Sequence, residues 1–325
     1  MSTKIMKRIL VTGATGQIGS ELTTELRKRY GSDNVTAAGH RRKPSEKLFS
    51  SGPFEYLDIG QKDDIEKLVE KYNIDTIYHL AAVLSAVGEQ RPQLTWDVNM
   101  NGLYNVLEVA KERNIVRLFW PSSIAVFGPE TPRLNTPQNT VLIPKTMYGV
   151  TKVAGELLCN YYFFRFGLDV RSVRYPGIIS SETPPGGGTT DYAVKIFYEA
   201  LRKKRYTCFV REDTVLPMMY MPDCTKAAID LMEADPSKIK CRTSYNVTGI
   251  SFSAGELAAE IMKYIPEFEC EYKPDFRQKI ADSWPMSIDD SVAREEWGWK
   301  STYDLRAMTK DMIEKLTERL TEGNL

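Results

Sequence analysis

Short apolar segments alternate with longer amphipathic segments along the first half of the chain. The apolar segments predict strands, because each is a continuous hydrophobic run of the length that is typical of strands covered on both faces. The amphipathic segments predict helices, because their apolar residues recur at helical spacing. We expect strands over residues 8–11, 34–38, 54–59, 75–82 and 116–120. We expect helices over residues 20–30, 96–113 and 147–166, and another that begins near Asp63 or Asp64.

Strands and helices that alternate at this spacing are typical of the α/β class, with a doubly wound parallel sheet of the Rossmann type. A chain of 325 residues is longer than one core usually fills, so we expect a smaller C-terminal lobe after this sheet. In that lobe the pattern predicts helices over residues 191–202, 224–233, 253–264 and 305–320, and a strand over 268–272.

A glycine-rich turn, Thr12-Gly13-Ala14-Thr15-Gly16-Gln17-Ile18-Gly19, connects the first strand to the first helix. Gly13 permits the tight turn, Gly16 lets backbone N–H groups approach a pyrophosphate, and Gly19 lets the helix pack on the strand. The helix N-terminus attracts the anion. A glycine triplet by itself is often only a turn, but its place after the first strand predicts a dinucleotide site.

The end of the second strand bears on the choice of dinucleotide. An acid usually stands there and binds the adenosine ribose, but this chain has Gly39-His40-Arg41-Arg42. The two arginines could receive a 2′-phosphate or form a solvated basic loop, so these residues leave NAD and NADP both open. Asp58, after the third strand, could accept a hydrogen bond from adenine or cap the next helix.

Three polar residues are candidates for catalysis. A helix over 147–166 places Tyr148 and Lys152 one turn apart on the same face, although chance alone would give such a pair about once in a chain of this composition. Ser123 follows the fifth strand, at the carboxyl edge where open α/β sheets bind their ligands. We expect Ser123 to act as a hydrogen-bond donor and not as a nucleophile, because neither histidine is placed to serve as its base. His79 we expect to be a core residue.

The composition indicates which class of molecule the protein binds. Lys+Arg and Asp+Glu balance at 43 each, which argues against nucleic acid and anionic membrane surfaces and favours a small molecule. The cysteines are scattered and odd in number, and the two histidines lack metal-ligand spacing, so we expect a reducing compartment, no disulfide framework and no metal site. No apolar run has the length of a membrane span, so we expect a soluble protein.

Because residues 1–177 contain the glycine turn, we assign them to a dinucleotide-binding domain. We assign residues 178–325 mainly to a substrate-binding lobe, and we expect some segments of this lobe to return to the first domain. The composition of residues 184–190 predicts a loop that is either a lid over the substrate or a flexible linker. Trp284, in a Pro-flanked turn, could close over the substrate or fill the space between the lobes.

The motifs Gly13-x-x-Gly16-x-x-Gly19, Ala81-Ala82, Ser123, Tyr148-x-x-x-Lys152 and Arg174-Tyr175-Pro176-Gly177 resemble, in order and spacing, those of the extended short-chain dehydrogenase/reductases. The resemblance implies that Tyr148 is the acid/base, that Lys152 holds the nicotinamide ribose and lowers the tyrosine pKa, and that Ser123 orients the substrate oxygen. It also implies a set of cofactor-binding residues: Gly13, Thr15, Gly16, Gln17, Ile18, Gly19, Arg41, Asp58, Ile59, Leu80, Ala81, Ala82, Asn99, Tyr148, Lys152, Tyr175 and Pro176.

Within this superfamily the chain is most similar to the short-chain L-threonine 3-dehydrogenases. The similarity is carried by residues 84–89, 121–129, 186–193 and 282–285. It implies NAD-dependent oxidation of L-threonine, with Ser85, Ser123, Tyr148, Gly188, Thr189 and Trp284 on the substrate side. Gly39, where relatives usually have Asp, weakens the inference to NAD without reversing it.

Two alternatives remain. A nucleotide-sugar epimerase or dehydratase would use the same Ser, Tyr and Lys, but it usually has an Asn after the Arg-Tyr strand, where this chain has Pro176-Gly177. A non-catalytic dinucleotide sensor would not need Ser123, Tyr148 and Lys152 together.

The resemblance also implies a homodimer through a four-helix bundle, for which Leu103, Leu107, Leu157 and Tyr161 are candidate contacts. It places eukaryotic relatives in the mitochondrial matrix and bacterial ones in the cytoplasm.

Overall fold

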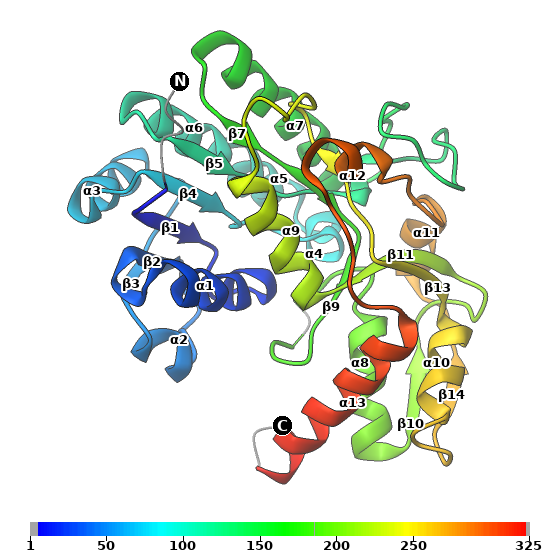
Figure 1. Ribbon diagram of the computed structural model, residues 1–325. Helices are drawn as coiled ribbons and strands as arrows, with labels where there is room; N and C mark the ends of the chain where they lie inside the picture. Colours follow the sequence, from blue (N-terminus) through cyan, green and yellow to red (C-terminus); the bar gives the residue numbers. More distant parts are fainter. Residues whose placement is uncertain (1–5, 185, 323–325) are drawn as a thin grey trace.

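The computed structural model describes residues 6–184 and 186–322 (Figure 1). Pro185, which belongs to the expected 184–190 loop, lies outside the described residues, as do residues 1–5 and 323–325 of the two expected domains. No described helix is long and apolar enough to span a membrane.

A six-stranded parallel sheet in the order β3-β2-β1-β4-β5-β7 forms the first half of the molecule, which confirms the doubly wound α/β fold. Its strands are β1 (Ile9–Thr12), β2 (Val35–Gly39), β3 (Phe54–Tyr56), β4 (Thr76–His79), β5 (Arg117–Phe119) and β7 (Val170–Arg171). The order reverses between β1 and β4, so a crevice opens at their carboxyl ends, where the glycine turn lies.

Alternate residues of each strand enter two separate apolar cores. Ile9 and Val11 of β1 pack into one core and Leu10 into the other. Helices α1 (Gln17–Tyr30) and α9 (Met221–Glu233) cover the first face, while α3 (Lys62–Tyr72), α6 (Gly102–Glu112) and α7 (Met147–Phe166) cover the second (Figure 1). Each fully buried Ile, Leu or Val contributes about 1.5–3 kcal/mol to this packing.

Helix α9 belongs to the second half of the sequence yet packs on the first sheet. Its residues Cys224, Ala227 and Leu231 share a core with Ile9 and Leu26. This packing agrees with segments of the lobe returning to the first domain, while the division at residue 177 stays a prediction.

The segment expected as one helix over 96–113 has three parts. Helix α5 (Pro92–Trp96) leads into a π-helical turn η2 (Asp97–Asn101) and then into α6. The turn presents Asn99, whose side chain bonds both the N–H and the carbonyl of Val83 at 2.8 and 3.1 Å. Helix periodicity cannot reveal this turn, because the bond that accompanies it reaches 16 residues back along the chain.

Several other predicted boundaries were wrong by a few residues. The helix expected over 20–30 begins at Gln17, and the strands expected over 54–59 and 75–82 end at Tyr56 and His79. Ala81-Ala82 therefore lies beyond the strand. Short helices α2 (Glu46–Ser50) and α4 (Ser85–Gln90) were not predicted, because each is too short to show a clear period.

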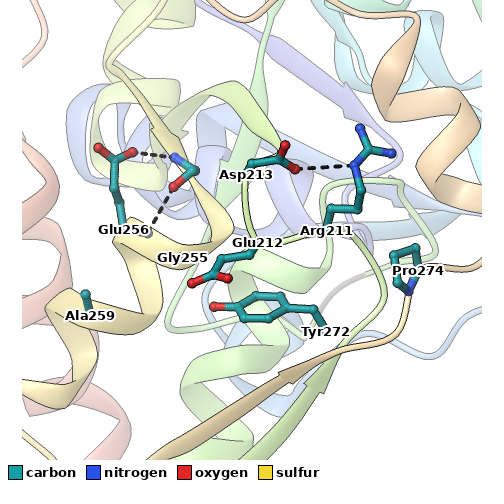
Figure 2. Close-up of a pocket in the computed structure, with 9 residues that line it drawn as sticks. Arg211, Glu212, Asp213, Gly255, Glu256, Ala259, Tyr272 and Pro274 are labelled. Carbon is teal, nitrogen blue, oxygen red and sulfur yellow. Dashed lines mark hydrogen bonds and ion pairs between the residues drawn. The ribbon is translucent and has the colours of Figure 1, made fainter.

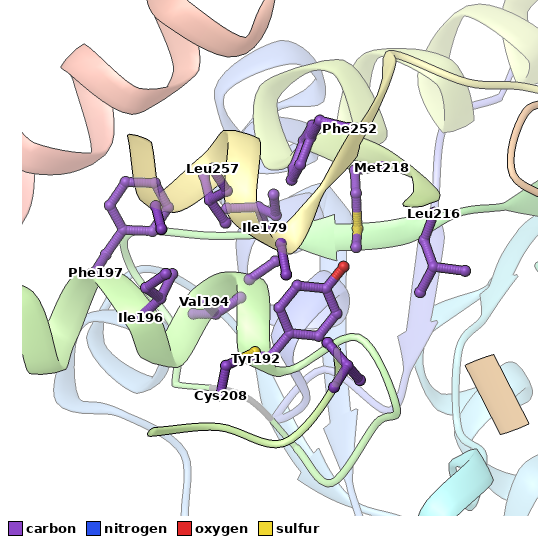
Figure 3. Packing of buried hydrophobic residues seen from close by; sticks show 14 of the residues in the cluster. Ile179, Tyr192, Val194, Ile196, Phe197, Cys208, Leu216, Met218, Phe252 and Leu257 are labelled. Atoms are coloured by element: carbon purple, nitrogen blue, oxygen red, sulfur yellow. The ribbon is translucent and has the colours of Figure 1, made fainter. Parts of the chain in front are cut away.

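The second lobe is built around a three-stranded sheet of β9 (Gly177–Ile179), β11 (Val215–Tyr220) and β13 (Ile250–Ser253). Its core includes residues of α8 (Tyr192–Lys203), α10 (Ala254–Met262) and α13 (Leu305–Thr321). Figure 3 shows Tyr192 of α8 pointing toward Ile179 and Met218 of this sheet. The remaining elements are η1 (Ser32–Asn34), β6 (Ser122–Ser123), η3 (Ile124–Val126), β8 (Val173–Tyr175), β10 (Arg205–Cys208), β12 (Tyr245–Asn246), β14 (Glu269–Tyr272), α11 (Phe276–Asp282) and α12 (Ser291–Trp297).

Candidate functional site

Helix α7 carries Tyr148 and Lys152 in its first two turns. Thr146 caps the helix, because its side chain accepts a hydrogen bond from the Gly149 N–H at 3.0 Å. Gly149 allows a close approach, since a Cβ at this position would lie only 2.2 Å from the carbonyl oxygen of Ala125. The start of α7 therefore packs directly on the segment that follows Ser123.

The packing brings Tyr148 to Ser123. Their side chains share a hydrogen bond, which lowers the tyrosine pKa, but burial has the larger effect and raises the pKa of Tyr148 to about 12. The Ser123 hydroxyl oxygen also accepts the Ala125 N–H at 3.2 Å. In the protein alone Tyr148 is therefore a neutral phenol at pH 7, held in place by its neighbour.

Lys152 is 3% exposed and lies behind the tyrosine. Its Nζ donates to the carbonyl of Pro121 at 2.6 Å and lies 4.4 Å from the centre of the Trp120 ring. Burial lowers the pKa of Lys152 from 10.5 to about 7. Lys152 Nζ lies 5.4 Å from the centre of the Tyr148 ring. Burial nevertheless keeps the Tyr148 pKa above its ordinary value of 10 in the protein alone, so the lowering implied by the family resemblance stays a prediction for the complex with the cofactor.

The glycine turn has the shape that a dinucleotide phosphate requires. Gly13 adopts φ +70°, and a Cβ there would lie 2.6 Å from the backbone nitrogen of Ala81, so only glycine fits. Gln17 begins helix α1, and its Nε2 is buried without a hydrogen-bond partner among the described residues. A buried donor without a partner at a helix N-terminus suits an anionic phosphate oxygen, so the residues present fit the cofactor.

The other expected cofactor residues fall into two groups. Leu80, Ala81, Ala82 and Asn99 surround the carboxyl end of β4, where Asn99 also donates to Thr151 of α7 at 3.2 Å. The second group is the turn itself, which contains Thr15 and Gly16, and the start of α1, which contains Ile18 and Gly19.

His79 is a neutral core residue, as expected. It is buried, it bonds the Thr12 hydroxyl through Nδ1 at 2.7 Å, and burial lowers its pKa to about 3.

Four further expected cofactor residues lie outside these two groups, and their contact with the cofactor stays a prediction. Tyr175 is buried with its hydroxyl bonded to the carbonyl of Cys224 at 2.7 Å, next to the buried Pro176. Ile59 is buried in the core beside Gly102. Asp58 is exposed and does not cap α3, because that helix begins after Gln61 and the Asp58 carboxylate accepts the Gly60 N–H at 2.9 Å.

Two expected substrate residues that are far apart in sequence lie side by side near helix α7. Ser85 begins α4, and its hydroxyl lies 3.1 Å from that of Thr189. Three residues later on α4, a Cβ at Gly88 would lie 3.7 Å from the Cβ of Tyr148. Ser85 and Thr189 therefore lie close to Tyr148.

Asp191 shapes the glycine loop that carries Thr189. Its carboxylate accepts the N–H groups of Gly187 and Gly188 at 2.8 and 3.0 Å. The loop lies against the start of α4, since a Cβ at Gly187 would contact Val87 at 3.2 Å. Asp191 was not predicted as a site residue, although its place three residues after Gly188 is the spacing of a short capped turn.

Trp284 is 4% exposed and belongs to the core of the second lobe. Tyr148 packs against the same core, which also contains Ile124 and Ala125. The Trp284 carbonyl accepts a hydrogen bond from Arg133 Nε at 3.4 Å. Trp284 is thus a packed residue on the lobe side of the crevice, and its contact with a substrate stays a prediction.

Two carboxylates that position the catalytic helix could not be found from the sequence. Glu89 of α4 accepts the Met147 N–H at 2.6 Å, directly before Tyr148. Glu156 lies one turn after Lys152 and is bonded to Ser122 at 2.6 Å and to Arg174. A glutamate on a helix is usually solvated, so only the three-dimensional neighbours reveal these roles.

A separate hollow of about 650 Å³ lies in the second lobe (Figure 2). None of the expected site residues lines it, and its lining consists of Arg211, Glu212, Asp213, Ser253, Gly255, Glu256, Ala259, Tyr272 and Pro274. Glu256 and Ser253 form the cap of α10, and Arg211 pairs with Asp213 (Figure 2).

Comparison with known proteins agrees with this geometry. The model of the NAD dependent epimerase/dehydratase family matches residues 9–248. An uncharacterised epimerase/dehydratase of Staphylococcus haemolyticus is 50% identical over 315 residues, which cover 97% of this chain and 99% of the relative. The structure of an L-threonine dehydrogenase from Clostridium difficile is 55% identical over 97% of this chain and 99% of its own, with a TM-score of 0.94.

A monomeric L-threonine 3-dehydrogenase of metagenomic origin is 48% identical over 95% of this chain and 99% of its own, with a TM-score of 0.92. These matches extend over both lobes. The chain belongs to the NAD dependent epimerase/dehydratase family and is an NAD-dependent oxidoreductase.

Proposed function

We propose that the protein oxidises L-threonine to 2-amino-3-oxobutanoate with NAD as the oxidant. The observation that carries the proposal is the hydroxyl pair of Ser85 and Thr189, which lies beside Tyr148 and joins α4 to the glycine loop. The full-length similarity to solved proteins described as L-threonine dehydrogenases supports the same substrate.

In the proposed reaction Tyr148 accepts the proton of the threonine β-hydroxyl while a hydride leaves the β-carbon, so that the alcohol becomes a ketone. Bound NAD⁺ supplies the hydride acceptor and a positive charge that favours the phenolate form of Tyr148. Ser123 holds the substrate oxygen through the hydroxyl that already bonds Tyr148. Lys152, one turn behind, holds the nicotinamide ribose.

Ser85 and Thr189 would bind the amino-acid end of the substrate, and Gly188 would let the loop come close to it. Their existing hydrogen bond fixes the two hydroxyls before a substrate arrives, which reduces the entropic cost of orientation. Trp284 would close the lobe side of the crevice.

A nucleotide-sugar epimerase or dehydratase is the rival within the family. Ligand binding raises the melting temperature only where the folded protein binds that ligand, so thermal shift separates the two. With NAD present, L-threonine should raise the melting temperature and UDP-glucose should not. The reverse result would favour the rival, and formation of NADH from threonine tests the chemistry directly.

We also propose a homodimer through α6 and α7. Leu157, Tyr161 and Phe164 share one face of α7 and are 60%, 53% and 72% exposed. The expectation was wrong for Leu103 and Leu107, which are fully buried against the first sheet, because the opposite face of α6 is the one that points to solvent. Large apolar side chains that are exposed together on one face of a helix are typical of an interface.

A further inference from the structure

The end of β2 packs closely against the glycine turn. Gly39 is buried, and a Cβ at this position would lie 2.7 Å from Cγ2 of Thr15 and 3.2 Å from the ring of Phe54. Thr15 therefore fills the space that a longer side chain at position 39 would need. An acid at the usual ribose-binding position would require the Thr15 side chain to move.

Asp58 is the other acid that was expected to contact the adenosine end of the dinucleotide. Asp58 lies two residues after the next strand, β3, and its Oδ1 already accepts the Gly60 N–H. Its Oδ2 lies 3.6 Å from Nε2 of His40. The carboxylate that usually repels a 2′-phosphate is therefore missing from position 39, and the Asp58 carboxylate faces an imidazole.

The three residues that follow His40 are all cations. Arg41, Arg42 and Lys43 are exposed. Within residues 6–184 and 186–322, neither Arg41 nor Arg42 forms a hydrogen bond or an ion pair. Two guanidinium groups without partners, directly after the second strand, are donors that a phosphate would satisfy in the bidentate geometry that arginine prefers.

A cavity of about 1320 Å³ extends from the glycine turn to Arg42 and Lys43, whereas Arg41 does not line it. Thr15 lines it together with Arg42, Lys43 and Ser45. Acidic residues also line it, among them Glu21 and Glu25 of α1 and Glu318 of α13, whereas the segment after β2 contributes the cations Arg42 and Lys43. The basic segment thus borders the same space as the residue that packs on Gly39.

From these observations we propose that the protein also binds NADP, with the 2′-phosphate held by Arg41 and Arg42. A phosphate monoester carries nearly two negative charges at pH 7, so two arginines without partners favour it over a free hydroxyl, and no carboxylate stands at position 39 to repel it. The proposal concerns the adenosine end of the dinucleotide only. It rests on the family's dinucleotide site and not on threonine as substrate, so either can fail without the other.

The test uses adenosine bisphosphates, which lack the nicotinamide and therefore report on this subsite without turnover. Calorimetric titration of the full chain with 2′,5′-ADP and 3′,5′-ADP compares two ligands of equal charge that differ only in the position of one phosphate. We expect 2′,5′-ADP to bind about tenfold more tightly, and that preference to weaken as salt rises. NADP⁺ should bind detectably in the same experiment.

Substitution then locates the subsite. The double variant Arg41→Ala with Arg42→Ala should lose the preference for 2′,5′-ADP, while Arg306→Ala, which removes an exposed arginine at the start of α13, should retain it. Equal affinity for the two isomers in the unmodified chain, no binding of either at millimolar concentration, or an undiminished preference in the double variant would each overturn the proposal.

Discussion

Glu156 and Arg174 form a bidentate ion pair in the interior, with Arg174 Nε and Nη2 donating to the two carboxylate oxygens at 2.9 and 2.8 Å. Their side chains are 1% and 4% exposed. The same carboxylate accepts the Ser122 hydroxyl at 2.6 Å. Since Glu156 lies one turn after Lys152 and Ser122 directly precedes Ser123, the pair fixes the catalytic helix to the strand end that carries Ser123.

Replacing one member of this pair should destabilise the protein strongly. Glu156→Gln leaves the Arg174 guanidinium buried without its counter-charge, which typically costs about 3–5 kcal/mol. Urea unfolding measures the loss. The double variant Glu156→Gln with Arg174→Met should recover part of it, because no unpaired charge then remains, and fully additive losses would contradict the role of the pair.

The Ser85–Thr189 contact predicts a kinetic effect. Ser85→Ala removes one hydroxyl from the amino-acid end, so KM for threonine should rise about tenfold while NAD binding is unchanged. The matched control is Ser244→Ala, which removes a hydroxyl from the buried Ser172–Ser244 pair at 2.6 Å, away from the crevice. Steady-state kinetics measure both variants, and equal KM values in the two would argue against the contact.

The sequence predicted the glycine turn and the helix that carries Tyr148 and Lys152 because their signals are local. The glycine turn, the helix over 147–166 and the Tyr148–Lys152 spacing depend only on residues that are neighbours along the chain. The predicted helix agrees with α7 at both ends. A position such as Ser123 follows from the rule that parallel strands place ligands at their carboxyl ends.

What the sequence could not reveal depends on contacts between distant residues. The π-helical turn at Asn99 accompanies a bond to Val83, and the place of Ser85 depends on Thr189, which lies 104 residues away. The high tyrosine pKa is a consequence of burial, which no local pattern around Tyr148 discloses. Glu156 and Glu89 are ordinary helix glutamates until their neighbours are known.

Glu21 predicts a pH dependence of stability. Burial raises the pKa of Glu21 from 4.5 to about 7; Glu182 adds to this effect, while the bond from Ser180 and the charges of Lys315 and Lys47 oppose it. Because the folded state holds the proton more tightly, the group's contribution is complete below pH 4.5 and is lost as the pH rises to about 7.

Glu21→Gln removes this titration. Above pH 7 the variant should be more stable than the unmodified protein by an amount on the order of 1 kcal/mol, and the difference should disappear or reverse near pH 4.5. Urea unfolding of both proteins at several pH values isolates the effect of this residue. A stability difference that does not change with pH would contradict the raised pKa.

The exposed face of α7 predicts an effect on assembly. Light scattering at micromolar concentration should give the mass of a dimer, and Phe164→Glu should convert it to a monomer by burying a charge in the contact. Lys145→Glu, an exposed change before the helix begins, serves as the control. A monomeric mass for the unmodified chain would rule out the dimer.

The formation of NADH from L-threonine and NAD⁺ tests the central proposal most directly. It is followed by absorbance for the unmodified chain and for Tyr148→Phe, which keeps the ring and removes the hydroxyl. We predict turnover in the former and a loss of at least about a thousandfold in the latter, with NAD still bound in both. Near-normal turnover in Tyr148→Phe, or no NADH from threonine in the unmodified chain, would contradict the proposal.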